Sequence, residues 1–82
     1  MSERLKMLGR LAELRLSAER LEMEIEDCRK SIRELLVPVE SPEEYEEKKV
    51  SFKGVRFAAA VVRYRAVLSL MADIRRELGE ET

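Results

Sequence analysis

The chain has 82 residues, of which 40% are charged and 45% hydrophobic, and its formal net charge is −1. A domain of this size buries only about 60–65% of its unfolded surface, so its core is marginal without a disulfide, a metal or a partner. The single cysteine, Cys28, excludes an internal disulfide, and the absence of histidine removes the commonest metal ligand and acid–base catalyst. We therefore expect no cofactor, no metal site and no enzymatic activity, and we expect oligomerisation instead.

The start of the sequence does not resemble a secretory leader. Residues 1–11 carry four charged side chains and no uninterrupted apolar stretch. The longest apolar run, 57–62, is far shorter than the ~20 residues that span a bilayer. We expect no membrane association and a cytoplasmic location, with Cys28 reduced.

The first predicted element is a long helix at about 3–36. Its apolar residues recur at spacings that alternate four and three, a heptad pattern that only a helix brings onto one side. Ser2 is the expected N-cap, and Pro38 ends the helix because the residue before a proline disfavours helical dihedral angles. The apolar series is Met7, Leu11, Leu14, Ala18, Leu21, Ile25, Cys28, Ile32 and Leu35.

A turn at 37–41 is followed by a second predicted helix at about 42–78. Ser41 is the expected cap, Pro42 suits the first helical position, and Glu44 completes a capping box. At the other end Gly79 is placed to form a left-handed C-terminal cap. The apolar series of this helix is Phe57, Val61, Tyr64, Leu68, Met71 and Leu78, widened by Val67, Leu70 and Ile74.

The stretch 51–54 leaves two alternatives to one straight second helix. Gly54 costs about 1 kcal/mol relative to alanine inside a helix, so the helix could be kinked or broken there. A short strand over 50–57 is the other alternative, because valine and phenylalanine favour strands.

A short connection between two long helices favours an antiparallel hairpin in a single domain, 1–82. Folding the chain about residue 40 brings the acidic stretch 19–27 opposite 53–61, where the chain is basic. No acidic residue lies between Lys48 and Ala72. Opposite charges on the two helices would select this orientation and register.

Each helix also has apolar residues on a second side, which an isolated hairpin leaves uncovered. We expect a second hairpin to cover them, most simply in a homodimeric four-helix bundle with two-fold symmetry. The expected oligomer interface is Leu5, Leu8, Leu16 and Met23 of the first helix and Val55, Ala59, Val62 and Ala66 of the second.

Three groups of polar or reactive residues are candidates for functional sites. Cys28 falls at a core position without a histidine base, which favours a structural role. Glu22 and Glu26 share one helix face, which is better interpreted as a solvated acidic face than as a metal site. Lys49, Lys53, Arg56 and Arg63 form a basic stripe that could contact an anion or nucleic acid, although pairing with the acidic stretch is favoured.

The sequence is compatible with three functions. The first is a non-enzymatic scaffold or interaction protein that self-associates. The second is a small chaperone or accessory subunit of a hetero-complex: in length and in its Pro38…Pro42 turn the chain resembles, in outline, helical-hairpin chaperones of bacterial secretion systems and accessory proteins of phages, a likeness that transfers no residue role. The third is a nucleic-acid accessory protein that uses the basic region Lys48–Arg65.

Overall fold

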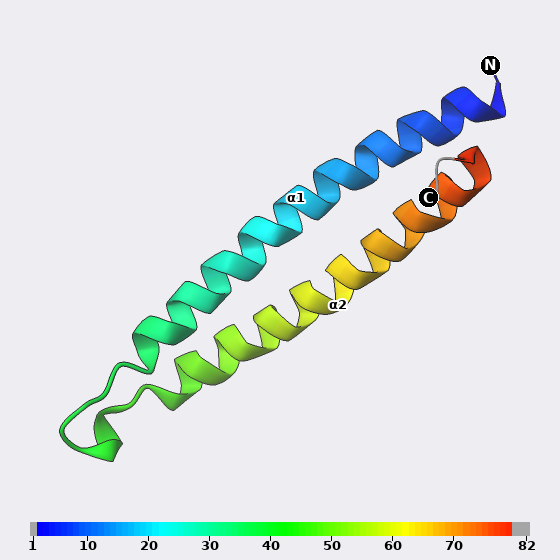
Figure 1. Ribbon diagram of the computed structural model, residues 1–82. Coiled ribbons are helices and arrows are strands. Elements are labelled where there is room, and N and C mark those ends of the chain that lie inside the picture. Colours follow the sequence, from blue (N-terminus) through cyan, green and yellow to red (C-terminus); the bar gives the residue numbers. More distant parts are fainter. Residues whose placement is uncertain (1, 80–82) are drawn as a thin grey trace.

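The computed structural model describes residues 2–79 as two long antiparallel helices with an irregular connection between them (Figure 1). Helix α1 spans Glu3–Leu35 and helix α2 spans Glu47–Leu78. A single 3-10 turn, η1, occupies Pro42–Glu44. The all-α hairpin predicted from the sequence is confirmed.

Both ends of α1 follow from local sequence. The backbone N–H of Leu5 donates to Ser2 Oγ at 3.2 Å, which satisfies one of the unpaired donors at the start of a helix. At the other end the N–H of Leu36 still reaches the carbonyl of Ile32 at 3.0 Å. The helix stops at Leu35, three residues before Pro38, within one residue of the predicted end.

The predicted start of the second helix at 42 is wrong, because α2 begins at Glu47. The start signal is present: a Glu44 carboxylate oxygen accepts the Ser41 N–H at 2.9 Å. These residues, however, form only the single turn η1, in which the N–H of Tyr45 donates to the carbonyl of Pro42 at 3.2 Å. Tyr45 then adopts an extended conformation with ψ 143°, and this separates η1 from α2.

Helix α2 runs without interruption through 51–54, so neither the break nor the strand over 50–57 forms. One glycine costs the helix about 1 kcal/mol, which the packing of the flanking turns against α1 offsets. The C-terminus matches the prediction, since Gly79 adopts a left-handed conformation with φ 73°. Within residues 2–79, no helix combines the length and apolar character that crossing a bilayer requires.

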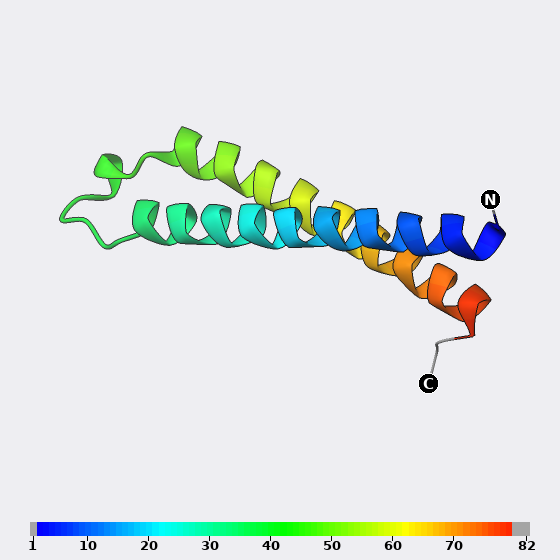
Figure 2. The same ribbon diagram turned by 90° about the horizontal axis from the view of Figure 1, so that it is seen from above.

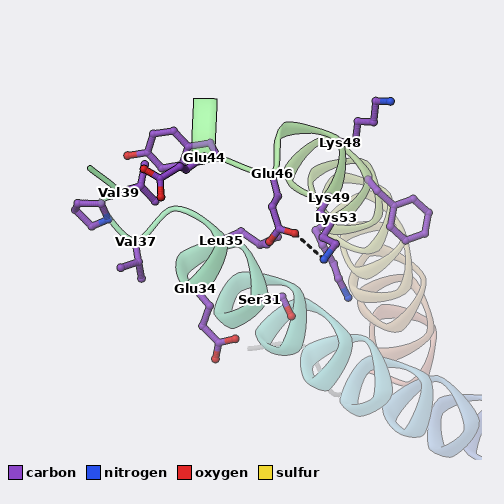
Figure 3. Close-up of a pocket in the computed structure, with 13 residues that line it drawn as sticks. Ser31, Glu34, Leu35, Val37, Val39, Glu44, Glu46, Lys48, Lys49 and Lys53 are labelled. Carbon is purple, nitrogen blue, oxygen red and sulfur yellow. Dashed lines mark ion pairs between the residues drawn. The ribbon is translucent and has the colours of Figure 1, made fainter. Parts of the chain in front are cut away.

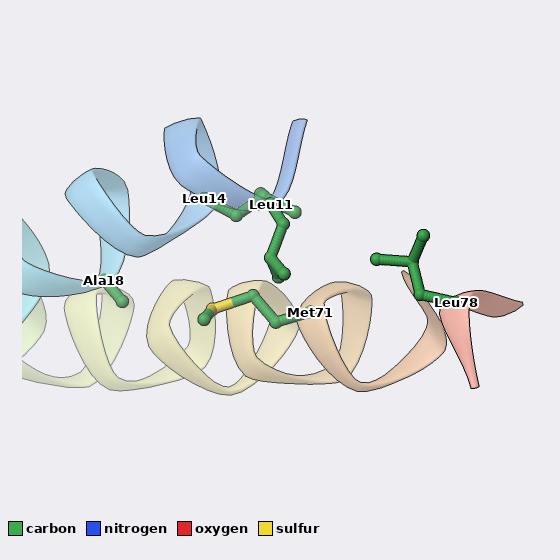
Figure 4. Close-up of a cluster of buried hydrophobic side chains, with 5 residues drawn as sticks. All are labelled: Leu11, Leu14, Ala18, Met71 and Leu78. Carbon is green, nitrogen blue, oxygen red and sulfur yellow. The ribbon is translucent and has the colours of Figure 1, made fainter. Parts of the chain in front are cut away.

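The predicted heptad positions of α1 form the contact with α2. All nine are buried or half-buried. The main cluster lies in the half of the hairpin that contains the chain ends, where Leu11 and Met71 are only 2% and 4% exposed (Figure 4). Cys28 and Ala60 are buried nearer the connection. The other members of the main cluster are Leu14, Ala18 and Leu78.

The register is antiparallel, as predicted from the charge distribution. An Arg4 guanidinium nitrogen lies 3.5 Å from the carbonyl oxygen of Leu78, and Arg56 Nη2 lies 3.7 Å from Glu24 Oε1. Seen from above, α2 crosses α1 at an angle (Figure 2), with the small side chain of Ala60 only 1% exposed. A small side chain buried between two helices allows their backbones to approach closely.

The hairpin is elongated, with extents of 62 × 24 × 14 Å and a radius of gyration of 18.4 Å. A compact chain of this length would have a radius of gyration of about 12 Å. The accessible surface is 6448 Å², whereas a compact monomer of this mass would expose about 5,100 Å². The hairpin therefore exposes more surface than a compact monomer of the same mass would.

Candidate interaction surfaces

All eight residues of the expected oligomer interface are exposed in the single hairpin. Met23 and Val55 are each 68% exposed, and Val62 is 63% exposed. In a soluble monomer an isolated exposed apolar residue is ordinary, but residues that recur at helical spacing form a continuous stripe.

On α2 the exposed apolar residues form the α2 edge stripe, defined as Val55, Ala59, Val62 and Ala66, with spacings of four, three and four. Val62 and the buried Met71 are nine residues apart, or about 2.5 helical turns, so they point in opposite directions. The α2 edge stripe therefore faces directly away from α1.

On α1 the corresponding α1 edge stripe is defined as Leu5, Leu8, Ala12, Leu16 and Met23. Leu14 is 6% exposed, and the 68% exposed Met23 follows it by nine residues, again about 2.5 turns. The α1 edge stripe therefore faces away from α2. The two stripes lie on opposite edges of the hairpin, a relation that the sequence prediction of one shared bundle core did not include.

The basic stripe is only partly neutralised by the acidic stretch of α1. Arg56 pairs with Glu24 across the hairpin and lies 5.9 Å from the Phe52 ring centroid, while Lys49 pairs with its neighbour Glu46 at 2.8 Å. Within residues 2–79, the other two members of the stripe, Lys53 and Arg63, form no ion pair. The predicted neutralisation by α1 thus applies to Arg56 alone.

The two candidate glutamates of α1 have separate partners. Tyr64 donates its hydroxyl hydrogen to Glu22 Oε1 at 2.7 Å, and this hydrogen bond raises the pKa of Tyr64. Arg29 binds Glu26 through two nitrogen atoms at 2.6 and 2.9 Å, and these hydrogen bonds lower the pKa of the Glu26 carboxyl. In the described part of the chain, no three acidic or cysteine side chains are grouped so that they could hold a metal ion.

Cys28 is 3% exposed, so its thiol is enclosed between the helices as the core position predicts. The side chains around a shallow pocket beside it include Met23, Lys53 and Arg56. The sequence contains no second cysteine that could form a disulfide with this thiol, and it contains no histidine that could activate it.

A cleft of about 710 Å³ lies at the connected end of the hairpin, between the end of α1, η1 and the start of α2 (Figure 3). Its apolar lining includes Val37, Tyr45 and Phe52, and Phe52 is 61% exposed. Figure 3 shows Glu46 and Lys49 joined by an ion pair beside this space, with Lys48 directed away from α1. Sequence reasoning missed the cleft because it depends on the path of the connection, although the apolar residues in a turn were a signal.

The lysines and glutamates around the cleft are equal in number, so charge favours neither anions nor cations there. The charged residues that line it are Lys48, Lys49, Lys53, Glu34, Glu44 and Glu46.

Comparisons with family models, curated proteins and solved structures returned no match to this chain.

Proposed function

We propose that the chain is a non-enzymatic interaction protein that self-associates, with two hairpins supplying the four helices of its smallest assembly. The observation that carries this proposal is the exposure of both edge stripes, over residues 5–23 of α1 and 55–66 of α2, in a thin, two-helix molecule. Burial of a valine or leucine side chain contributes about 1.5–3 kcal/mol, so covering several of them provides a substantial driving force.

The surface area supports the same proposal. The hairpin exposes roughly 1,300 Å² more than a compact monomer of equal mass would. A stable interface buries about 800 Å² on each partner, so a second copy can cover much of this surplus. An assembly of such hairpins would act as a scaffold or an adaptor rather than as a catalyst.

The nucleic-acid alternative has weaker support. Two of the four residues of the basic stripe, Lys49 and Arg56, are engaged by glutamates, which leaves Lys53 and Arg63 for an external anion. Phosphate contacts supply most of the affinity for nucleic acid, and two cations provide only a small part of a usual interface.

The test is the molar mass of the full chain by sedimentation equilibrium across the micromolar range. We expect a mass of at least two chains, and we expect the α2-edge variant Val55→Glu/Val62→Glu to return to the single-chain 9.6 kDa. Burying two charges in an apolar contact weakens association far more than tenfold.

The matched control is Arg10→Gln/Arg33→Gln, which changes the net charge by the same two units away from both edge stripes. Circular dichroism should show unchanged helicity in both variants, because all four positions are exposed. A wild-type chain that stays a folded monomer throughout would refute self-association.

A further inference from the structure

We infer that the hairpins associate edge to edge, with the α2 edge stripe of one copy against the α1 edge stripe of the next. This inference rests on the proposed self-association and names the contact that produces it. It is carried by three properties of the two stripes: the directions they face, the sizes of their side chains and the charges beside them.

The first property is direction. Because the stripes face away from each other, a second hairpin stacked on one flat face of the first cannot cover both of them. A symmetric contact between two α2 edges would cover one stripe and leave the other exposed in both copies. A contact between unlike edges draws on both stripes of every copy except those at the ends of the assembly, and in the register of the hairpin it joins 16–23 of one copy to 59–66 of the next.

The second property is size. The α2 edge stripe alternates valine with alanine, whereas the α1 edge stripe presents leucine and methionine. If a second copy lies beside the first in the register of the hairpin itself, Ala59 falls opposite Met23 of the second copy and Ala66 falls opposite its Leu16. At these two levels a large side chain faces a small one, which fills the space between helices, while Val62 falls opposite Arg20 and Val55 opposite Asp27 of the second copy.

The third property is charge. In the same register Arg65, which flanks the α2 edge stripe, comes within two residues, or about 3 Å along the helix axis, of the level of Glu19 of the second copy. Both side chains are exposed, and neither forms an ion pair in the part of the chain that the structure describes. A contact between two α2 edges would instead bring together two copies of the segment from Lys48 to Ala72, which contains basic residues and no acidic residue. Repulsion between like charges therefore opposes that arrangement.

A contact between unlike edges does not close upon itself at two copies. Each hairpin in a pair keeps one uncovered edge stripe, so further copies can add at both ends. The average mass should therefore rise past two chains as the concentration of the protein rises.

The decisive experiment mixes two full-length variants that are each blocked on one edge. The α1-edge variant carries Leu16→Glu/Met23→Glu, and its partner is the α2-edge variant Val55→Glu/Val62→Glu. Each alone should sediment at 9.6 kDa, because each lacks one half of the contact. An equimolar mixture should form a one-to-one complex of twice that mass, since the intact α2 edge of one meets the intact α1 edge of the other.

The outcomes separate this inference from the proposed function. If the α1-edge variant alone remains a dimer and mixing adds nothing, the contact joins two α2 edges and the inference fails while self-association stands. A wild-type mass that stays at two chains at every concentration also overturns the inference. A monomeric wild-type chain overturns the proposed function itself.

A charge exchange tests the register. Arg65→Glu should weaken association up to about fivefold, as expected for one exposed ion pair, and Glu19→Arg should have a similar effect. The double variant Glu19→Arg/Arg65→Glu restores the pair between copies and should recover the wild-type association constant. Failure of the double variant to recover it excludes the proposed register.

Discussion

Tyr64 and Glu22 join the two helices through single side chains. Tyr64 packs against the buried cluster with its ring and donates its hydroxyl hydrogen to Glu22 on the other helix. A tyrosine suits this position because it has an apolar body and a polar end. The hydrogen bond to a carboxylate favours the neutral phenol, and this raises the pKa of Tyr64.

This pairing gives a pH dependence with a definite sign. Because the pKa of Tyr64 is higher in the folded chain, its contribution to stability is complete below the unfolded value of about 10 and disappears as the pH rises through the folded value. We expect Tyr64→Phe to lower the thermal midpoint slightly at neutral pH, and we expect the difference from wild type to vanish at strongly alkaline pH.

The pKa itself can be followed by ultraviolet absorbance in a Tyr45→Phe background, where Tyr64 is the one tyrosine left. Glu22→Gln should lower the pKa of Tyr64 in that background. An unchanged titration curve would show that the hydrogen bond does not set it.

Residue-scale features were predictable from the sequence where they depend on near neighbours. Ser2 caps α1 and Gly79 ends α2 because each acts on backbone groups within a few residues. The bond between Tyr64 and Glu22 was not predicted, because it depends on the antiparallel register to within about one residue. Charge patterning set that register only approximately.

At the scale of the element, α2 has one glycine inside it and one at its C-terminal cap, in opposite circumstances. Gly54 lies inside the helix, and a Cβ added there would meet no heavy atom within 4 Å. Gly79 follows the helix with φ 73°, a conformation that an L-residue with a side chain disfavours. The same substitution should therefore have opposite effects at the two positions.

We expect Gly54→Ala to raise the free energy of unfolding by about 1 kcal/mol and Gly79→Ala to lower it by about 1–2 kcal/mol. Urea denaturation followed by circular dichroism measures both. Gly9→Ala is the matched control inside α1, where an added Cβ also meets no atom within 4 Å, and it should resemble Gly54→Ala. A loss of stability in Gly54→Ala would mean that a neighbouring copy packs against that position.

The buried side of α1 was predicted more accurately than the residue at which α2 begins. The heptad series of α1 predicted which side contacts α2, because apolar residues at alternating spacings of four and three lie on one side of a helix. The start of α2 was misplaced by five residues, because the Ser41–Glu44 signal is satisfied equally well by one 3-10 turn. Local hydrogen bonds do not specify whether a turn continues into a long helix.

At the scale of the whole molecule, the two-helix hairpin has few buried residues for its length. The described residues include seven buried hydrophobic side chains, which is a small core for a chain that exposes 6448 Å². The sequence predicted the excess of apolar surface but not the opposite directions of the two edge stripes, because these depend on which residues of each helix are buried against the other. The nine-residue separations of Leu14 from Met23 and of Val62 from Met71 were the signal.

If association contributes to stability, the thermal midpoint must depend on protein concentration. We expect it to rise by about 3–5 °C for each tenfold increase in the wild-type concentration, because only the folded chain associates. Differential scanning calorimetry at several concentrations measures the rise. The α2-edge variant should melt at one temperature regardless of concentration, and a concentration-independent wild type would contradict the expectation.

The hairpin has its two described chain ends together and its connection at the far end of a 62 Å molecule (Figure 1). A row of copies joined by unlike edges keeps every hairpin pointing the same way, so its two margins differ. One margin collects the connections, where residues 38–47 of each copy bring five glutamates and no basic residue. The other margin collects the chain ends, so a module fused to either end would be displayed along that border alone.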